Sequence, residues 1–302
     1  MNANMKRNAN SVALVTGVSS GIGREIVQLL AEQGFRVFGT ARNLATADPI
    51  GGVDLIRMDV TDDTSVADGV NSVMETAGQI HFLVNNAGYA LNGALEETSL
   101  QEAQQQFDTN FFGVLRVTQA VLPAMRRQRY GRIVNISSLL GLLPAPYRGI
   151  YAASKHALEG YTETLDHEVR TFGIRAVLVE PRFTKTNIAG NEKVAQLRLD
   201  SYADQRARVN EVVNQRITRG DEPRAVAEVV WRALTAESPC PRYPVGEGVT
   251  LSRLRRFVPA GLFDRSFRKQ FQLDEPVRER RPSRVKEASD GNNRQPTFAK
   301  DQ

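Results

Sequence analysis

The sequence predicts an α/β fold in which helices cover both faces of one doubly wound, parallel β-sheet. Six short runs of almost continuous apolar residues are spaced along the chain between residue 11 and about residue 245. Strands that are buried on both faces have this pattern, because none of their side chains faces water. Segments with helical spacing of apolar residues separate the runs. This alternation is unbroken, which indicates one domain rather than two.

The six predicted strands are residues 11–16, 35–40, 53–58, 80–85, 132–136 and 174–179. After the first strand, apolar residues recur at helical spacing at Ile22, Ile26, Leu29 and Leu30, and Gly34 suits the position after a helix end. This is a βαβ unit. The further predicted helices are residues 61–77, 100–127, 149–172 and 223–236.

The main domain is therefore expected to cover residues 11–250. Within it, residues 187–219 form a polar insertion with a helical stripe at Val209, Val212, Val213 and Ile217. Residues 251–274 carry leucines and phenylalanines among basic residues, and we expect a C-terminal helical cap there. Residues 275–302 are charged and poor in apolar residues, which predicts disorder. Residues 1–10 are expected to be flexible, and no apolar segment of a signal peptide follows them.

The composition excludes several classes of protein. Of the 302 residues, 41% are hydrophobic and 24% are charged, as in an ordinary globular protein. A single cysteine, Cys240, excludes a disulfide framework and a zinc site made of several thiolates, and the three histidines are far apart. No run of 18 apolar residues predicts a membrane span, and the net charge of +5 comes without a nucleic-acid-binding motif. We therefore expect a cytoplasmic protein that binds neither metal nor nucleic acid.

A glycine-rich segment, T-G-V-S-S-G-I-G at 16–23, joins the first strand to the first helix. Glycines in this place permit a tight turn and let backbone N–H groups approach a pyrophosphate at the helix N-terminus. An ordinary tight turn is the alternative. The strand before the segment and the amphipathic helix after it favour a dinucleotide site.

The end of the second strand indicates which dinucleotide is bound. An acidic residue there would bind the ribose 2′-hydroxyl of NAD, but residues 39–43 read G-T-A-R-N and contain no carboxylate. The guanidinium of Arg42 can instead pair with the 2′-phosphate of NADP. The alternative is an arginine that merely lies on the surface. The missing acid favours NADP(H) over NAD(H).

Two further strand ends are candidates for the same site. Asp59 and Val60 follow the third strand, where an adenine edge would rest. Asp59 would also suit a cap of the next helix, and Thr61 or Asp62 could serve as that cap too. The sequence N-N-A-G at 85–88 ends the fourth strand, and its small residues would let a ribose pass close to the sheet. A simple strand-ending turn is the alternative there.

The third cluster carries acid–base chemistry. Tyr151 and Lys155 are four residues apart on one predicted helix, so they share a face, and Ser138 ends the fifth strand. A free phenol has a pKa near 10, and a neighbouring ammonium favours its phenolate form. Such a pair can exchange a proton with a substrate alcohol or carbonyl, while Ser138 donates a hydrogen bond to the same oxygen.

With these motifs, residues 11–246 resemble the classical short-chain dehydrogenase/reductases, and near the catalytic helix the hydroxysteroid and retinol type. The resemblance implies a Rossmann-type sheet and a catalytic tetrad of Asn110, Ser138, Tyr151 and Lys155, in which Asn110 helps to anchor a water that relays protons to Lys155. Without the resemblance, Asn110 would pass for an ordinary polar residue. The implied cofactor-binding residues are Gly17, Ser19, Ser20, Gly21, Ile22, Gly23, Arg42, Asp59, Val60, Asn86, Ala87, Gly88, Tyr151, Lys155, Pro181, Thr184 and Thr186.

One position departs from the family pattern. The family usually has Pro-Gly after the sixth strand, and here Arg182 follows Pro181. This puts the local backbone geometry in doubt and places a cation near the mouth of the site. Thr186 still matches the position that is expected to reach the nicotinamide amide.

The predicted function is that of an NADP(H)-dependent oxidoreductase acting on a carbonyl or secondary alcohol. The alternative is a non-catalytic NADP sensor or scaffold, which would need the glycine loop but no tetrad. The apolar residues Leu139, Leu140, Leu142, Leu143, Pro144 and Pro146 favour a lipophilic or ring-bearing substrate, unless they serve only for packing. The expected partners are a small-molecule substrate and further copies of the chain, as a dimer or tetramer. Residues 251–271 are more easily explained as a cap than as a membrane-surface helix.

Overall fold

The computed structural model describes residues 11–185, 192–246 and 258–274. Its main sheet has seven parallel strands in the order β3-β2-β1-β4-β6-β7-β9. The strands are β1 (Val12–Thr16), β2 (Arg36–Ala41), β3 (Val53–Arg57), β4 (Phe82–Asn85), β6 (Gly131–Ile136), β7 (Ile174–Glu180) and β9 (Arg242–Pro244). The doubly wound parallel sheet predicted from the sequence is thus confirmed. The strand order reverses between β1 and β4, which creates a crevice at their carboxyl ends.

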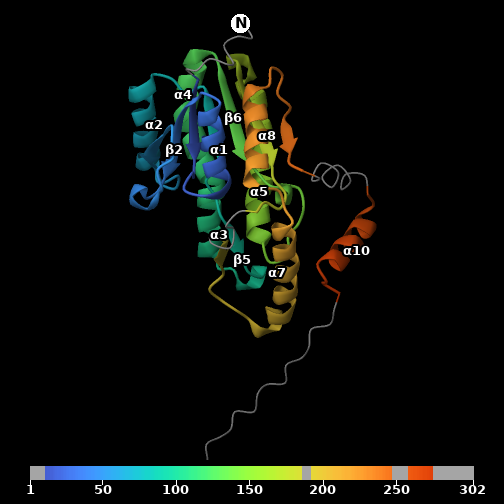
Figure 1. Ribbon diagram of the computed structural model, residues 1–302. Helices are drawn as coiled ribbons and strands as arrows, with labels where there is room; N and C mark the ends of the chain where they lie inside the picture. The colour runs from blue at the N-terminus through green and yellow to red at the C-terminus, as the bar shows by residue number, and fades with distance from the viewer. Residues whose placement is uncertain (1–10, 186–191, 247–257, 275–302) are drawn as a thin grey trace, which may run out of the picture.

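Helices cover both faces of this sheet (Figure 1). They are α1 (Gly21–Glu32), α2 (Asp63–Ala77), α3 (Leu100–Phe107), α4 (Gly113–Gln128), α5 (Gly149–Val169), α7 (Ala203–Thr218), α8 (Pro223–Thr235) and α10 (Ala260–Gln270). On β1, Ala13 and Val15 face α1 and α8, whereas Val12 and Leu14 face the opposite layer, which contains α2, α4 and α5. The six strands predicted from the sequence each contribute to two cores in this way, which explains their continuous apolar runs.

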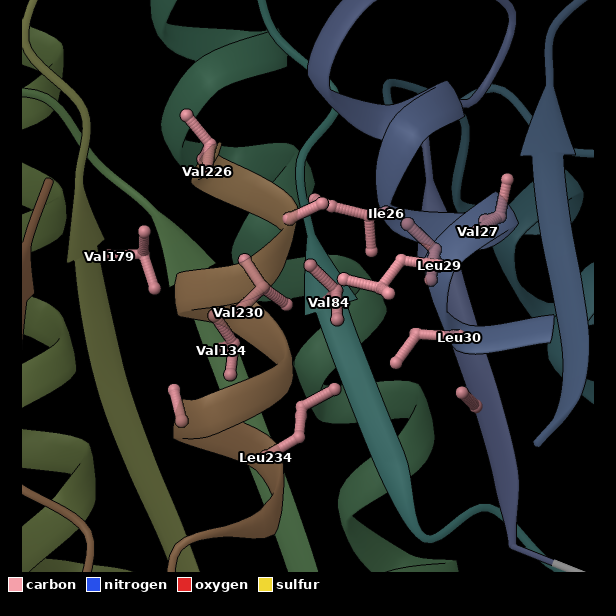
Figure 2. Packing of buried hydrophobic residues seen from close by; sticks show 14 of the residues in the cluster. Ile26, Val27, Leu29, Leu30, Val84, Val134, Val179, Val226, Val230 and Leu234 are labelled. Carbon is pink, nitrogen blue, oxygen red and sulfur yellow. The ribbon is translucent and has the colours of Figure 1, made fainter. Parts of the chain in front are cut away.

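The core between α1, α8 and the sheet consists of interdigitated aliphatic side chains (Figure 2). Ile26 and Leu30 of α1 face Val230 and Leu234 of α8, above Val84 and other strand residues. All five of these side chains are almost completely buried. This packing holds the start of α1 in place against the end of β1, where the glycine-rich segment lies.

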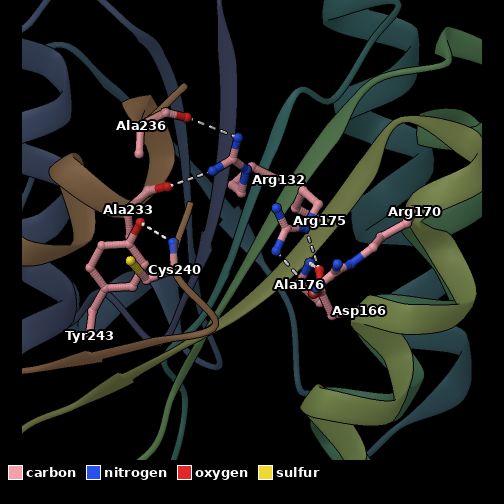
Figure 3. A network of polar contacts seen from close by, with 9 residues as sticks. All are labelled: Arg132, Asp166, Arg170, Arg175, Ala176, Ala233, Ala236, Cys240 and Tyr243. Atoms are coloured by element: carbon pink, nitrogen blue, oxygen red, sulfur yellow. Dashed lines mark hydrogen bonds and ion pairs between the residues drawn. The ribbon is translucent and has the colours of Figure 1, made fainter. Parts of the chain in front are cut away.

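At the amino-terminal ends of β6 and β7, opposite the crevice, Arg132, Arg175 and Asp166 form polar contacts with neighbouring elements (Figure 3). Arg132, at the start of β6, is 4% exposed and donates to the carbonyl oxygens of Ala233 at 2.9 Å and Ala236 at 3.2 Å. These carbonyls end α8 and have no partner within the helix, so the guanidinium acts as a C-terminal cap. Asp166 of α5 accepts hydrogen bonds from Arg175 at 2.7 Å and from the backbone N–H of Ala176 at 3.0 Å.

A smaller lobe lies beyond the carboxyl ends of the strands. It contains a two-stranded parallel sheet, β5 (Ala90–Asn92) with β8 (Glu192–Val194), and helix α7. The sequence pattern predicts α7 correctly but not β5, β8 or β9, because strands of three residues are too short to show a period. Phe271, which follows α10, is buried against Val209 and Val213 of α7.

Other boundaries differ from those expected. The helix expected over residues 100–127 is two helices, α3 and α4, joined by a π-helical turn, Asp108–Phe112. The helix expected over residues 61–77 begins at Asp63, because the Asp62 side chain caps it by accepting from the N–H of Ser65 at 2.7 Å. The expected tail 275–302, the N-terminus 1–10 and most of residues 251–259 lie outside the described residues.

Candidate active site

A cavity of about 410 Å³ opens at the carboxyl ends of the central strands. Most of the residues predicted from the sequence line it: Gly17, Ser19, Ser20, Gly21, Ile22, Gly23, Arg42, Asp59, Val60, Asn86, Ala87, Gly88, Ser138, Tyr151, Lys155, Pro181 and Thr184. Asn110 does not line it, and Thr186 lies outside the described residues. The fold therefore brings the glycine-rich segment and the Ser–Tyr–Lys group to one place.

The glycine-rich loop is shaped by contacts that leave no room for a side chain. Gly17 has φ +71°, and a Cβ on it would lie 2.8 Å from the Cα of Ala87. A Cβ on Gly23 would lie 2.2 Å from the carbonyl oxygen of Gly17. The Asn86 amide donates to the carbonyl oxygens of Thr16 at 3.0 Å and Gly17 at 2.8 Å. The N-A-G segment is thus part of the loop's scaffold as well as a strand end.

Arg42 and Asp59 lie at the ends of β2 and β3, on the wall of the same cavity. Arg42 is exposed. Asp62, and not Asp59, caps α2. The Asp59 carboxylate instead accepts hydrogen bonds from the N–H of Thr61 at 3.0 Å and from the Thr61 hydroxyl at 2.8 Å. Burial raises the pKa of the Asp59 carboxyl, but these hydrogen bonds and the charge of Arg42 outweigh burial and hold that pKa below its usual range.

Tyr151 and Lys155 project from the first two turns of α5, and Ser138 follows the end of β6. The Lys155 Nζ lies 5.8 Å from the centre of the Tyr151 ring and donates to the carbonyl oxygen of Ile136 at 2.7 Å. Burial lowers the pKa of Lys155 to about 8, although the carboxyl of Glu159 raises it.

The pKa of Tyr151 departs from the expectation. Burial raises it, and a hydrogen bond with Ser138 and the charge of Arg148 oppose this rise without cancelling it. The sequence had predicted that Lys155 would bring the phenol toward its ionised form. In this structure burial dominates instead, because a phenolate loses hydration when it is enclosed. The Tyr151 phenol is therefore protonated at neutral pH.

Asn110 lies in the π-helical turn between α3 and α4 and is 1% exposed. Its carbonyl oxygen accepts from the N–H of Tyr89 at 3.1 Å, and its amide donates to the carbonyl oxygen of Tyr89 at 2.9 Å and to the Ser154 hydroxyl at 3.3 Å. A π-helical turn rotates the residues that follow it, and such turns are frequent at functional sites. Asn110 thereby ties the N-A-G loop to the catalytic-helix candidate, α5.

The segment after β7 carries Pro181, Arg182 and Thr184 to the cavity wall. Thr184 is 2% exposed, and its hydroxyl has no hydrogen-bond partner among the described residues. The backbone beside it is held by a bridge between Thr184 and Asp221 and by a hydrogen bond from the Lys185 N–H to the carbonyl oxygen of Asp221 at 2.8 Å. The arginine in place of the usual glycine is therefore accommodated in an ordered segment.

Sequence reasoning missed one wall of the cavity. Tyr89, Glu192 and Lys193 line it, with the Lys193 Nζ 4.4 Å from the centre of the Tyr89 ring and Glu192 2.8 Å from Arg148. These residues come from the β5–β8 lobe, and no local pattern marks them. For the apolar segment 139–146 the sequence leaves open a lipophilic substrate site or plain packing. None of its residues is among the described residues that line the cavity, and Leu139 and Leu143 are buried, which favours packing.

Two classes of site have no support in the described residues. No group of three or more His, Cys, Asp or Glu side chains is arranged to hold a metal ion. None of the helices in residues 11–185, 192–246 and 258–274 has both the length and the apolar character needed to cross a membrane.

The chain is similar to several known proteins. A family model described as short chain dehydrogenase matches residues 11–196. The chain is 36% identical to 3-ketodihydrosphingosine reductase of Bacteroides thetaiotaomicron, over 85% of this chain and 96% of that protein. It is 41% identical to retinol dehydrogenase 8 of Bos taurus, over 60% and 62%. A crystal structure of a short-chain dehydrogenase from Streptomyces avermitilis has a TM-score of 0.74 and 31% identity, over 87% of this chain and 97% of that one.

Proposed function

The chain belongs to the classical short-chain dehydrogenase family, and we propose that it moves hydride between NADP(H) and a carbonyl or secondary alcohol. One observation carries this proposal: Tyr151, Ser138 and Lys155 line the same cavity as the glycine-rich loop. A phenol that could donate a proton thus lies beside the loop that would bind the dinucleotide. A protein that only sensed or stored the dinucleotide would need the loop but not this group.

The chemistry of the cavity fits a nicotinamide dinucleotide at both ends. At one end, the close approach between Gly17 and Gly23 brings the N-terminus of α1 to the cavity, where its backbone N–H groups would bind the pyrophosphate. At the other end, the buried hydroxyl of Thr184 lacks a partner among the described residues, and a polar group of the nicotinamide would supply one.

Arg42 supports NADP(H) rather than NAD(H). It lies at the end of β2, where a 2′-phosphate on the adenosine ribose would be placed in this fold, and residues 39–43 contain no carboxylate. A carboxylate there would repel a phosphate, whereas a guanidinium forms charge-assisted hydrogen bonds with it.

The bound cofactor would supply the hydride, and the chain would supply placement and the proton. In the reducing direction, Tyr151 would donate its phenolic proton to the substrate oxygen, which Ser138 would also hold by a hydrogen bond. The ammonium of Lys155 would then stabilise the phenolate and bind the nicotinamide ribose. The raised pKa of Tyr151 supports this assignment, because it keeps the phenol protonated before the reaction. Asn110 would support the proton relay to Lys155.

We propose a lipophilic substrate. The support comes from the names of two relatives, since ketodihydrosphingosine and retinol each combine a long apolar part with a carbonyl or hydroxyl group. Tyr89, whose ring faces Lys193 at the cavity wall, would contact such an apolar part.

A panel of lipophilic ketones, aldehydes and alcohols, assayed by nicotinamide absorbance with NADPH, NADH and their oxidised forms, tests the proposal. Tyr151→Phe should remove nearly all turnover of any active compound and leave NADPH affinity almost unchanged, because only the proton donor is lost. Lys155→Ala should weaken both. Turnover of Tyr151→Phe equal to that of the parent would overturn the assignment. Tight NADPH binding with no turnover across the panel would favour the sensor or scaffold.

A further inference from the structure

Two buried carboxyl groups lie behind Lys155 and have no part in the function proposed above. Glu159 is one turn further along α5 and is 4% exposed, and Glu180 is the last residue of β7 and is 2% exposed. Neither is among the residues that line the cavity. Burying two carboxyl groups is costly unless they are paired or hydrogen-bonded, so their partners indicate what they do.

Arg242 of β9 joins the two carboxyl groups. Its Nη1 contacts Glu159 and lies 2.5 Å from Glu180, while its Nε lies 3.0 Å from Glu163, which is half exposed. The hydroxyl of Ser137 donates a short hydrogen bond to Glu159. In the described part of the chain, the charged groups around Glu159 are Arg242 on β9, Glu180 on β7 and Lys155 one turn back on α5. Glu163, on the same helix, is linked to them through Arg242.

The single positive charge of Arg242 cannot neutralise the charges of all three carboxyl groups that it contacts. Burial, together with the like charge of Glu180, raises the pKa of Glu159 to about 7, although Ser137 and Arg242 lower it. Burial also raises the pKa of Glu180. Each of the two carboxyl groups therefore keeps its proton to higher pH than a free glutamate does, as close carboxyl pairs generally do.

The pair is connected to Lys155 in two ways. The lysine and Glu159 are four residues apart on α5, which puts them on the same face of the helix. In addition, the Lys155 Nζ donates to the carbonyl oxygen of Ile136 at 2.7 Å, and the next residue is Ser137, which binds Glu159. Because both groups are enclosed, water screens their interaction only weakly.

We propose that Glu159, paired with Glu180, is a positioning residue that keeps Lys155 in its ammonium form and sets the upper pH limit of proton transfer by Tyr151. This rests on the roles proposed above for Tyr151 and Lys155. Glu159 touches neither the cavity nor the phenol and acts only through the lysine. When Glu159 loses its proton, its charge favours the cation beside it, so Lys155 stays charged to higher pH than burial alone would allow.

Glu159→Gln isolates this charge, because the amide oxygen can still accept from Ser137 while the negative charge is gone. We expect the variant to lower the pKa of Lys155 from about 8 by about one unit, as expected for a buried neighbouring charge. Glu163→Gln is the matched control. It removes a carboxylate that lies on the same helix and binds the same Arg242, but this carboxylate is half exposed, and the Ser137 hydroxyl binds Glu159 instead.

The first measurement needs no substrate. The chain has seven lysines, so ¹³Cε-lysine NMR gives few signals, and Lys155→Arg assigns the signal of interest. Titration from pH 6 to 10 should show the lower pKa in Glu159→Gln and the parent value in Glu163→Gln. An unchanged pKa in folded Glu159→Gln, or an equal fall in both variants, would overturn the proposal. Thermal melting establishes that each variant is folded.

If Glu159→Gln does not fold, the reciprocal measurement replaces it, since coupling between two titrating groups acts equally in both directions. In Lys155→Met the neighbouring cation is absent, so the pKa of the Glu159 carboxyl should rise above about 7. This is read from ¹³Cδ-glutamate signals of the parent and the variant. A Glu159 pKa that is the same in both would contradict the coupling.

The second measurement uses any carbonyl compound that the parent protein reduces. Relative to the parent, Glu159→Gln should have nearly the same kcat/KM at pH 6 and a value about tenfold lower at pH 9, because a pKa about one unit lower leaves about a tenth of the ammonium there. A purely structural role would lower kcat/KM equally at both pH values. If no carbonyl is reduced, the proposed function fails while the lysine titration still decides this inference.

Discussion

The side-chain amide of Asn86 donates to the carbonyl oxygen of Gly17 at 2.8 Å and so joins the end of β4 to the turn after β1. The same amide nitrogen would lie 2.4 Å from a Cβ on Gly23. The segments that contain Gly17, Gly23 and Asn86 therefore meet so closely that there is no room for one additional methyl group. The chain's own contacts hold the glycine-rich loop in this shape, which would reduce the entropy that binding a dinucleotide there must overcome.

Gly23→Ala should disrupt this meeting point. The new methyl group would overlap the backbone oxygen of Gly17, and backbone cannot move aside as a flexible side chain can. We expect an NADPH affinity at least tenfold lower and a loss of stability of about 1–3 kcal/mol. Calorimetric titration and chemical denaturation measure the two effects. The control is Gly160→Ala on α5, where a Cβ meets nothing within 4 Å and a helix should gain up to about 1 kcal/mol. Equal NADPH affinity in both variants would refute this account.

Arg42→Ala tests the cofactor preference. Hydrogen bonds to charged groups contribute about 1.5–3 kcal/mol, which corresponds to roughly ten- to hundredfold in affinity, and less if salt screens the exposed site. The variant should bind NADPH more weakly and NADH about as before. Affinities for both cofactors at fixed ionic strength provide the measurement.

Arg24→Ala is the matched control for Arg42. Arg24 lies in the first turn of α1, next to the glycine-rich loop, but its side chain donates to the carbonyl oxygen of Asp48 at 3.4 Å and does not line the cavity. If the parent protein binds NADH as tightly as NADPH, the interpretation of Arg42 as a site for the 2′-phosphate is wrong. A preference that survives in Arg42→Ala but disappears in Arg24→Ala would assign the phosphate to Arg24.

Arg132→Met should destabilise the fold without altering the site. It removes the donor that satisfies the carbonyl oxygens of Ala233 and Ala236 at the end of α8, and it keeps most of the buried volume. We expect the free energy of unfolding to fall by about 2–4 kcal/mol. Urea denaturation measures this loss. The exposed Arg127→Met, on α4, should change stability by less than about 0.5 kcal/mol, and a similar value for Arg132→Met would show that the cap contributes nothing.

Asp166 should make stability depend on pH on the acid side. Burial raises the pKa of its carboxyl, but hydrogen bonds from Arg175, Arg170 and the N–H of Ala176 outweigh burial and leave the pKa lower than in the unfolded chain. A depressed pKa adds stability above the unfolded value near 4, and this stability is lost as the pH falls through the folded value.

The parent should therefore be more stable than Asp166→Asn at pH 7, and the difference should shrink as the pH falls below about 4. Denaturation of both proteins across this range, with the exposed Glu168→Gln on the same helix as a control, provides the measurement. A difference that stays constant with pH would mean that the charge of Asp166 does not stabilise the fold.

The sequence alone determined the features that depend on local patterns. Continuous apolar runs marked the six longer strands, because both faces of this sheet are covered, and the helical stripe at Val209 and Val213 marked α7. The glycine spacing at 17–23 and the Tyr151–Lys155 spacing indicated the candidate site. Both depend on residues that are close in the sequence: glycines permit a tight turn, and a spacing of four puts two side chains on one face of a helix. The family resemblance added Asn110. No spacing in the sequence predicts the π-helical turn in which this residue lies.

Only the tertiary structure decided which distant groups meet. The β5–β8 strands are too short to show a period, so the placement of Tyr89 and Lys193 on the cavity wall could not be read from the sequence. The same holds for the pKa of Tyr151, which burial raises although a lysine lies one turn away. The meeting of Glu159, Glu180 and Arg242 depends on three elements that are adjacent only in the folded chain. Burial and the close approach of charges are properties of packing, and a one-dimensional pattern contains neither.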